Sequence, residues 1–248
     1  MTPFLFVTDL DNTLVGDDSA LVELNQRLSQ HRQEYGTKIV YATGRSLALF
    51  RELQAAKQLL EPDALVAAVG TEIYLNRSEP DAAWSEKLSQ GWNRDLIVAT
   101  TAHFADLVPQ PETEQRPFKV SFLLTEAIAQ EVMPQLESSL QKQSLDIKLI
   151  YSTGQDLDII PRHSDKGLAV QFLRSSWGIA PEQTVVCGDS GNDIALFAVG
   201  ESRGIIVGNA SSELLQWHNA NRVDYHYLAK AACAGGILEG LKHFGFLG

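Results

Sequence analysis

Short apolar runs alternate with amphipathic stretches over the first 70 residues of the chain. The run from Phe4 to Val7 is continuously apolar and ends at Thr8-Asp9, which is the pattern of a buried parallel strand. Leucines at helical spacing then predict a helix over residues 19–33. Two further apolar runs, at 38–41 and 64–69, predict the next strands. This rhythm predicts an α/β fold with a parallel, doubly wound, Rossmann-like sheet.

A different rhythm follows Gly70 and lasts to about residue 160. Helical stretches and short strands occur here in one block, at 84–104, 118–124, 126–140, 147–151 and 157–160. The first rhythm then returns, with strands and helices that again alternate. We therefore expect a core domain formed by residues 1–79 and 161–248, with a smaller α+β domain inserted at 80–160.

Charge and composition narrow the classes of partner. The 248 residues include 31 acidic side chains against 20 lysines and arginines, a formal net charge of −11. Such a chain repels nucleic acid and anionic membranes, and it has no apolar run of the roughly 18 residues that a membrane span needs. Its two cysteines are far apart, which favours reduced thiols. We expect a cytoplasmic protein that binds neither nucleic acid nor membranes.

A pair of carboxylates directly follows the first predicted strand, in Asp9-Leu-Asp-Asn-Thr13. Two carboxylates at alternate positions can divide the work of a phosphoryl transfer. One can attack phosphorus, while the other protonates the leaving alcohol and later activates water. An isolated Asp-x-Asp is, however, more often a turn or a solvated loop.

Two further polar pieces lie at predicted helix starts. Thr43-Gly44-Arg45 offers a hydroxyl and free backbone N–H groups that can bind phosphate oxygens. Lys166 opens a predicted helix, where a cation opposes the helix dipole unless it faces an anion. Taken alone, each piece is better explained as an ordinary helix start or an exposed lysine.

The fourth piece, Gly188-Asp189-Ser190-Gly191-Asn192-Asp193, ends another apolar strand. Its carboxylates and amide are hard oxygen ligands of the kind that suits Mg²⁺. In an open parallel sheet the carboxyl ends of the strands line one crevice, so the four pieces would meet there. One shared site explains them better than four unrelated turns.

In this order the four pieces resemble the four motifs of the haloacid dehalogenase-like phosphatase superfamily. The resemblance implies that Asp9 is the nucleophile and that Asp11 is the general acid and then the general base. It also implies that Thr43 and Lys166 hold the transferring phosphoryl group.

The same resemblance implies Mg²⁺ as the cofactor. The metal ligands that it implies are Asp9, Asp189, Asp193 and the backbone carbonyl of Asp11. It further implies that the insertion, which lies between the second and third motifs, is a cap that closes over the core and supplies substrate specificity.

Longer stretches are similar to the sucrose-phosphatase (sucrose-6-phosphate phosphohydrolase) family over nearly the whole chain. They include residues 9–16, 41–45, 69–74, 117–121, 156–161 and 187–193. The resemblance implies hydrolysis of sucrose 6-phosphate to sucrose and phosphate, the last step of sucrose biosynthesis. Two alternatives stay open: a related phosphatase for trehalose 6-phosphate or a sugar phosphoglycerate, and a non-catalytic regulator that binds a sugar phosphate.

Substrate-binding residues are harder to assign from the sequence. The candidates are Gly44, Arg45, Gly70, Thr71, Glu72, Lys119 and Asn192. Glu72 follows a strand end and can accept hydrogen bonds from hydroxyls, and Lys119 lies on a predicted strand of the insertion; each also fits a solvated surface position. We expect a monomer that binds a small sugar phosphate, and association with sucrose-phosphate synthase stays open.

Overall fold

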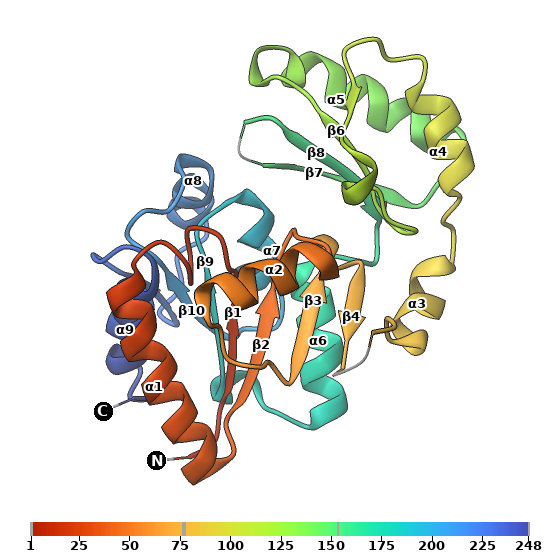
Figure 1. The fold of residues 1–248 in the computed structure, drawn as a ribbon. Coiled ribbons are helices and arrows are strands. Elements are labelled where there is room, and N and C mark those ends of the chain that lie inside the picture. Colours follow the sequence, from red (N-terminus) through yellow and green to blue (C-terminus); the bar gives the residue numbers. More distant parts are fainter. Residues whose placement is uncertain (1, 76–77, 153, 248) are drawn as a thin grey trace.

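The computed structural model describes residues 2–75, 78–152 and 154–247. Within them, the larger sheet has seven strands in the order β11-β10-β9-β1-β2-β3-β4 (Figure 1). These strands are β1 (Leu5–Thr8), β2 (Lys38–Ala42), β3 (Ala64–Ala67), β4 (Glu72–Tyr74), β9 (Thr184–Gly188), β10 (Arg203–Ile206) and β11 (His226–Leu228). Neighbouring strands pair in parallel except β3 and β4, which are antiparallel. The predicted α/β sheet is confirmed, with one antiparallel edge strand.

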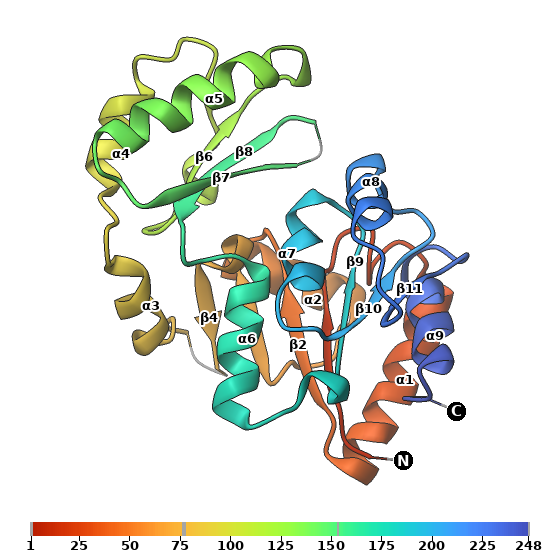
Figure 2. The same ribbon diagram turned by 180° about the vertical axis from the view of Figure 1, so that it is seen from behind.

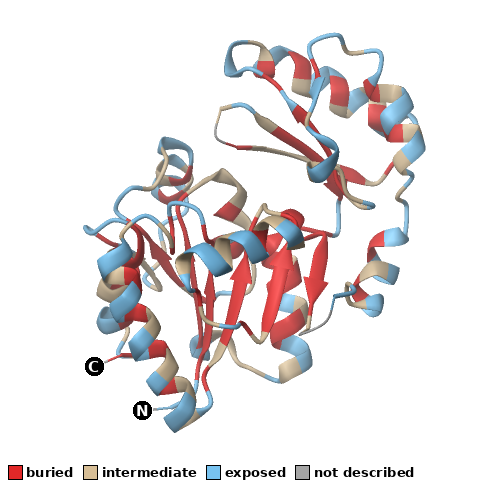
Figure 3. Ribbon diagram, in the orientation of Figure 1, coloured by how far each residue is buried: buried red, intermediate tan, exposed pale blue. Residues whose placement is uncertain are grey.

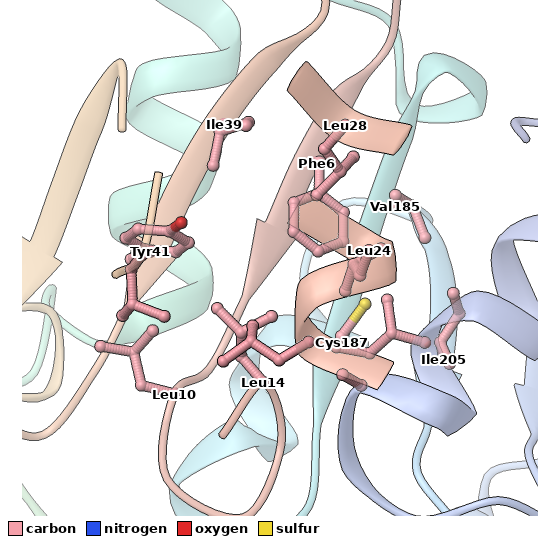
Figure 4. Close-up of a cluster of buried hydrophobic side chains, with 14 of the residues drawn as sticks. Phe6, Leu10, Leu14, Leu24, Leu28, Ile39, Tyr41, Val185, Cys187 and Ile205 are labelled. Atoms are coloured by element: carbon pink, nitrogen blue, oxygen red, sulfur yellow. The ribbon is translucent and has the colours of Figure 1, made fainter. Parts of the chain in front are cut away.

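Helices cover both faces of the larger sheet (Figures 1 and 2). Successive side chains of β1 point to opposite faces. Phe6 packs with Leu24 and Ile237 in one cluster, part of which Figure 4 shows, while Leu5 packs with Leu173 in the other. The helices are α1 (Asp18–Tyr35), α2 (Leu47–Lys57) and α9 (Cys233–His243) on the first face, and α6 (Lys166–Trp177), α7 (Ile194–Ala198) and α8 (Ser212–Ala220) on the second.

The insertion contains a second, antiparallel sheet in the order β5-β6-β8-β7. Its elements are β5 (Val108–Pro109), β6 (Val120–Leu123), β7 (Ile147–Ser152) and β8 (Asp156–Pro161), with α4 (Arg94–Thr101) and α5 (Glu126–Lys142). Ile97 of α4 and Leu136 of α5 pack against Ile159 on one face of this sheet. Figures 1 and 2 show both helices on the side away from the larger sheet, so the other face is turned toward the carboxyl ends of β1, β2 and β3.

A short helix, α3 (Ala82–Ser89), precedes this second sheet and packs on the larger one. Trp84 and Leu88 are fully buried together with Val66 and Ile73 of the core strands. Trp84 also donates its indole N–H to the Gly70 carbonyl at 3.1 Å. The domain boundary expected at residue 80 stays a prediction, and the helix that follows it is attached to the core.

Short elements differ most from those predicted. The strand expected at 64–69 ends at Ala67, because Ala68 and Val69 have φ angles of 50° and 60° and form the 3₁₀ turn η1 (Ala68–Gly70). The helical stretch at 84–104 is divided into α3 and α4, and the side chain of Asn93 caps the second helix. No sequence pattern indicated α8 or the half-buried, partly polar β11. The predicted strands β1, β2 and β3 are, in contrast, almost entirely buried (Figure 3). The other 3₁₀ turns are η2 (Glu112–Glu114), η3 (Pro181–Gln183) and η4 (Gly191–Asp193).

Candidate active site

The carboxylate of Asp9 lies at the carboxyl end of β1, between β2 and β9. Its backbone N–H donates to the Cys187 carbonyl on β9 at 3.0 Å. Beyond it the chain turns sharply, since the carbonyl of the buried Leu10 accepts backbone N–H groups at 2.8, 3.0 and 3.3 Å. Asn12 has a φ of 58°, which this turn requires. The turn therefore fixes Asp9, which is only 6% exposed, at the centre of the sheet's edge.

Lys166 is the first residue of α6 and is completely buried. Its Nζ donates to Oδ1 of Asp9, Oδ1 of Asn192 and Oδ1 of Asp193, each at 2.7 Å. Burial acts to lower the pKa of Lys166, but the carboxylates of Asp193 and Asp9 outweigh it, and the pKa is raised. The Lys166 ammonium is therefore held in its charged form beside the carboxyl end of β1. A cation at a helix N-terminus is unfavourable by itself, and its pairing with the carboxylates of Asp9 and Asp193 offsets this.

Three buried carboxylates, those of Asp9, Asp189 and Asp193, meet beside this lysine. One oxygen of each lies within 4.8 Å of the others. Burial, opposed by Lys166 and reinforced by the neighbouring carboxylates, raises the pKa of Asp9. Burial, and after it repulsion from Asp193, raises the pKa of Asp189 to about 6. Three carboxylates and one ammonium leave the ionised cluster with excess negative charge, which a divalent cation would neutralise.

Hydrogen bonds hold the second and third of these acids in place. Oδ1 of Asp189 accepts from the Thr13 hydroxyl at 2.8 Å. Oδ2 of Asp193 accepts the backbone N–H groups of Asp189 and Ser190, each at 3.1 Å. Gly188 allows this approach, because a Cβ at that position would lie 2.5 Å from the Cβ of Asp193. The glycine and the acids of the fourth motif thus form one packed unit.

The carboxylate of Asp11 faces a different partner. It accepts Nε of Arg45 at 2.8 Å and Nη2 of Arg45 at 2.7 Å, a two-point ion pair at the end of β2. The side chains are 48% and 32% exposed, respectively. Asp11 and Arg45 thus lie together at the solvent side of the site.

Thr43 and Gly44 follow β2 beside this pair. The hydroxyl of Thr43, which is fully buried, accepts the backbone N–H of Arg45 at 3.1 Å. Gly44 lies at the surface of the site, whereas Thr43 lies beneath it. The turn that the sequence predicts to bind phosphate is therefore adjacent to both Asp9 and Asp11.

A cleft of about 310 Å³ opens above these residues, between the larger sheet and the insertion. The predicted site residues that line it are Asp9, Asp11, Gly44, Arg45, Lys119, Asp189 and Asn192. Lys119 comes from the insertion, is 3% exposed, and has its Nζ 3.3 Å from Asp158 and 3.7 Å from Glu114. A larger cavity of about 520 Å³ lies beside α2, and none of the predicted site residues is among the described residues that line it.

Three of the predicted substrate-binding residues lie outside the lining of the cleft. Gly70 has a φ of 93°, and a Cβ there would lie 2.1 Å from the backbone of Asp165, just before Lys166. The Thr71 hydroxyl donates to the Ala68 carbonyl at 2.9 Å. Glu72 is 3% exposed and is bound to Arg116 and Tyr74. Their contacts are within the protein, so the strand end at 70–72 holds neighbouring segments in place and does not line the cleft.

Several residues that line the cleft were not predicted from the sequence. They belong to the insertion: Gln110, Glu114, Ser152, Asp156 and Asp158. The alternation of Asp156 and Asp158 in an otherwise apolar strand was the available signal, because alternate residues share one face of a sheet. The insertion therefore brings polar side chains to the roof of the cleft.

The fold and the acids at its strand ends define the class of protein as a haloacid dehalogenase-like hydrolase. A haloacid dehalogenase-like hydrolase from Bacillus subtilis has the same fold, with a TM-score of 0.69 at 18% identity over 98% of this chain and 92% of that one. Residues 2–245 match the family described as sucrose-6F-phosphate phosphohydrolase. The chain belongs to this family, and the resemblance stated from the sequence is confirmed.

Individual relatives agree with this assignment. The chain is 41% identical to "Probable sucrose-phosphatase 2" of Arabidopsis thaliana over 97% of its own length and 59% of the relative's, so it spans about three-fifths of the plant protein. It is 34% identical to a mannosylfructose-phosphate phosphatase of Agrobacterium fabrum, over 97% of this chain and 96% of that protein. The sucrose-phosphatase of Synechocystis, solved in complex with sucrose and phosphate, has a TM-score of 0.92 at 42% identity and covers 99% of both chains.

Proposed function

We propose that this protein is a phosphatase that hydrolyses sucrose 6-phosphate to sucrose and phosphate through an aspartyl-phosphate on Asp9. The observation that carries the proposal is the buried cluster of Asp9, Lys166, Asp189 and Asp193 at the floor of a cleft whose roof is polar. Family membership over residues 2–245 supports the activity, and the Synechocystis relative, similar over 99% of its length, supports the sugar.

Asp9 would attack phosphorus, and the bond between phosphorus and the sugar oxygen would break. The departing oxygen would take a proton from Asp11, whose side chain Arg45 holds beside the cleft. Asp11 would then remove a proton from a water molecule that attacks the aspartyl-phosphate, which releases phosphate and restores Asp9. Lys166 would neutralise charge on the transferring group, with Thr43, Gly44 and Asn192 beside it.

We propose Mg²⁺ as the cofactor, because the donor set fits it. Hard carboxylate oxygens from Asp9, Asp189 and Asp193 lie within 4.8 Å of one another in a buried cluster with excess negative charge. The Asp11 carbonyl is the further ligand that the superfamily resemblance implies. When bound, Mg²⁺ would stabilise negative charge on the phosphoryl oxygens.

Substrate choice would belong to the insertion, which we propose acts as a cap over the core. Gln110, Lys119 and Asp158 lie across the cleft from the catalytic acids and offer both donors and acceptors. A site that pairs each hydroxyl of a sugar rejects ligands that leave such groups unpaired. From the core side, the predicted substrate residues that line the cleft are Gly44, Arg45 and Asn192.

A second candidate is a phosphatase for a different disaccharide phosphate. The Agrobacterium relative, which matches over 96% of its length, is a mannosylfructose-phosphate phosphatase. Trehalose 6-phosphate and a sugar phosphoglycerate remain alternatives from the sequence. These activities would use the same acids and differ only in the roof of the cleft.

Location and assembly stay predictions. In the described part of the chain, no helix is long and apolar enough to cross a bilayer. We propose a monomer in the cytoplasm that acts on a small sugar phosphate, and association with sucrose-phosphate synthase remains open.

Phosphate release from a panel of sugar phosphates tests the proposal. Wild type should prefer sucrose 6-phosphate and require Mg²⁺, whereas Asp9→Asn should be inactive on every substrate. Asp106→Asn, at an exposed position, is the control for loss of one carboxylate. A preference for another sugar phosphate would keep the mechanism and change the substrate. Full activity in Asp9→Asn would overturn the mechanism.

A further inference from the structure

Glu72 is a buried carboxylate that joins the core to the insertion. It lies on the edge strand β4 and is 3% exposed. Its Oε1 accepts Nε of Arg116 at 2.7 Å, and its Oε2 accepts the Tyr74 hydroxyl at 2.7 Å. A buried carboxylate is costly unless it is paired, so Arg116 is fixed to the core at this point.

Arg116 begins a tight turn that is held at both ends. Its N–H donates to the Lys119 carbonyl at 3.0 Å, and the Lys119 N–H donates back to the Arg116 carbonyl at 3.2 Å. Two side chains of the insertion also hold the turn: Nε of Arg94 donates to the Arg116 carbonyl at 3.2 Å, and Nε1 of Trp92 to the Pro117 carbonyl at 2.8 Å. The turn from Arg116 to Lys119 is therefore a rigid unit.

Lys119, at the far end of this turn, faces the cleft. It lines the same cleft as Asp9 and Asp11, and it is 3% exposed. Its Nζ is 3.3 Å from Asp158 and 3.7 Å from Glu114, which also line the cleft. A shift of Arg116 would thus be passed through the hydrogen-bonded turn of residues 116–119 to the Lys119 ammonium in the roof of the cleft.

We propose that Glu72 is a positioning residue which, through Arg116, sets the place of Lys119 above the catalytic acids and so governs binding of the sugar. This inference rests on the proposed function, because it assumes that the roof reads a sugar phosphate. It gives Glu72 a role different from the direct sugar contact that the sequence suggested. Glu72 would thus affect binding of the sugar indirectly, whereas Asp9 and Lys166 would act on the phosphoryl group.

A comparison of two substrates tests this role. Glu72→Gln keeps the shape and an acceptor oxygen but removes the charge that holds Arg116. It should raise KM for sucrose 6-phosphate by about tenfold while changing kcat less than about twofold. With p-nitrophenyl phosphate, which has no sugar, both constants should stay near those of wild type. Glu86→Gln, an exposed acid on α3, is the matched control.

A double-mutant cycle with Arg116→Met separates positioning from direct contact. If Glu72 acts through Arg116, each single variant and the double variant should have the same raised KM. Arg51→Gln, at an exposed arginine beside the other cavity, controls for loss of an arginine. Multiplicative effects on KM would overturn the proposal, since Glu72 would then contact the sugar independently. Equal losses on both substrates would also overturn it.

Amide hydrogen exchange of the purified protein gives a readout that does not depend on the substrate. Exchange in residues 116–120 should be faster in Glu72→Gln and in Arg116→Met than in wild type, while exchange in α5 stays the same. Unchanged exchange in this turn would contradict the proposal. If wild type prefers another sugar phosphate, the proposed substrate fails, but the exchange result and the cycle on the preferred substrate still decide the role of Glu72.

Discussion

Asp9 and Asp11 are two positions apart, yet their carboxylates lie in different surroundings. In a continuous strand they would share one face of the sheet. The turn at Leu10 separates them, so that the side chain of Asp9 is 8% exposed and bound to Lys166, while that of Asp11 is 48% exposed and paired with Arg45. A nucleophile benefits from a fixed and dry position, whereas a group that first donates and later accepts a proton needs access to water.

Arg45 provides the first test at this scale. We predict that Arg45→Met lowers kcat about fivefold, because Asp11 loses the two hydrogen bonds that orient it; an exposed ion pair contributes at most about 1 kcal/mol. Arg45→Lys keeps the charge without the two-point contact, so its kcat should lie between those of wild type and Arg45→Met. Steady-state kinetics with Mg²⁺ measure both.

The Asp11→Asn background is the control for this prediction. In the Asp11→Asn protein, Arg45→Met should cause no further loss of kcat if Arg45 acts through Asp11. Losses that multiply would instead indicate that Arg45 binds the substrate directly, as the sequence suggested.

The sequence motifs predict which residues come together at the site. They do not predict which other side chains each of these residues contacts. Lys166, Asn192 and Asp193 are brought to Asp9 because the sheet topology forces strand ends together. Glu72 was expected to face a sugar and is instead paired with Arg116, 44 positions away. That pairing depends on how the insertion folds back on the core, which no local pattern of residues encodes.

The helix that begins with Lys166 is positioned by an unusually close backbone contact. A Cβ on Gly70 would lie 2.1 Å from the backbone carbon of Asp165 and 2.5 Å from the backbone nitrogen of Lys166. Asp165 also caps α6, since its Oδ1 accepts the Leu168 N–H at 2.7 Å, and its other oxygen is bound by Lys148 of the insertion. The start of α6 is thus confined from several sides.

Gly70→Ala tests this contact. The new methyl group cannot fit unless α6 moves, so Lys166 should shift away from Asp9. We predict a loss of about 3 kcal/mol or more in unfolding free energy and at least a tenfold drop in kcat. Urea denaturation and phosphate release measure the two effects.

Gly36→Ala is the matched control for backbone strain. Gly36 also has a positive φ, of 80°, but a Cβ there would meet nothing within 4 Å. Gly36→Ala should lower the unfolding free energy by only about 1–2 kcal/mol and leave kcat unchanged. Equal effects of the two substitutions would show that crowding at α6 is not important.

A second test at the scale of elements concerns β11. The ring of His226 lies 5.6 Å from Phe197 and 5.9 Å from His218. Burial, and after it the charge of His218, lowers the pKa of His226 to about 4. The unfolded chain, in which histidine has a pKa of about 6.5, therefore binds more protons at this position between these values, so the contribution of His226 to stability should fall as the pH drops through this window.

His226→Phe should remove this contribution. Urea denaturation of both proteins at several pH values measures this: the unfolding free energy of wild type relative to the variant should decrease as the pH falls from about 6.5 to about 4. A difference between the two proteins that is independent of pH would contradict this role of His226.

Long elements were predicted from the sequence and short ones were not, for a physical reason. Leucines at helical spacing indicate α1, whose Leu21, Leu24 and Leu28 are buried as expected. β11 has three residues, and none of them is fully buried, so it has no apolar run to detect. Its strand pairing with β10 is a tertiary contact.

At the scale of the whole molecule, a chain with a net charge of −11 has a binding cleft for an anion. The cleft is lined by Asp9, Asp11, Glu114, Asp156, Asp158 and Asp189, and its cations include Arg45 and Lys119. A phosphate ester entering such a cleft would meet repulsion unless a cation were bound to the acidic cluster. The proposed metal would therefore serve substrate binding as well as chemistry, and its affinity should depend on the protons that the cluster retains.

We predict that Mg²⁺ binding releases protons and strengthens as the pH rises. Burial raises the pKa of both Asp9 and Asp189, the latter to about 6, and a protonated carboxyl is a poor metal ligand. Through pH 6 the affinity should increase by up to about tenfold per pH unit for each proton released. Calorimetry in two buffers of different ionisation enthalpy measures both the affinity and the proton count.

Stability without the metal should change in the opposite direction. Asp189 of the folded protein retains a proton between about pH 4 and pH 6 that the unfolded chain has lost, so its contribution to the unfolding free energy should fall as the pH rises through this window. Saturating Mg²⁺ should reverse that fall, because the ion replaces the protons and binds only the folded state. Asp189→Asn should lose most of the affinity, whereas the exposed Asp106→Asn should keep it. An affinity for Mg²⁺ that is independent of pH would contradict a metal site built on these buried acids.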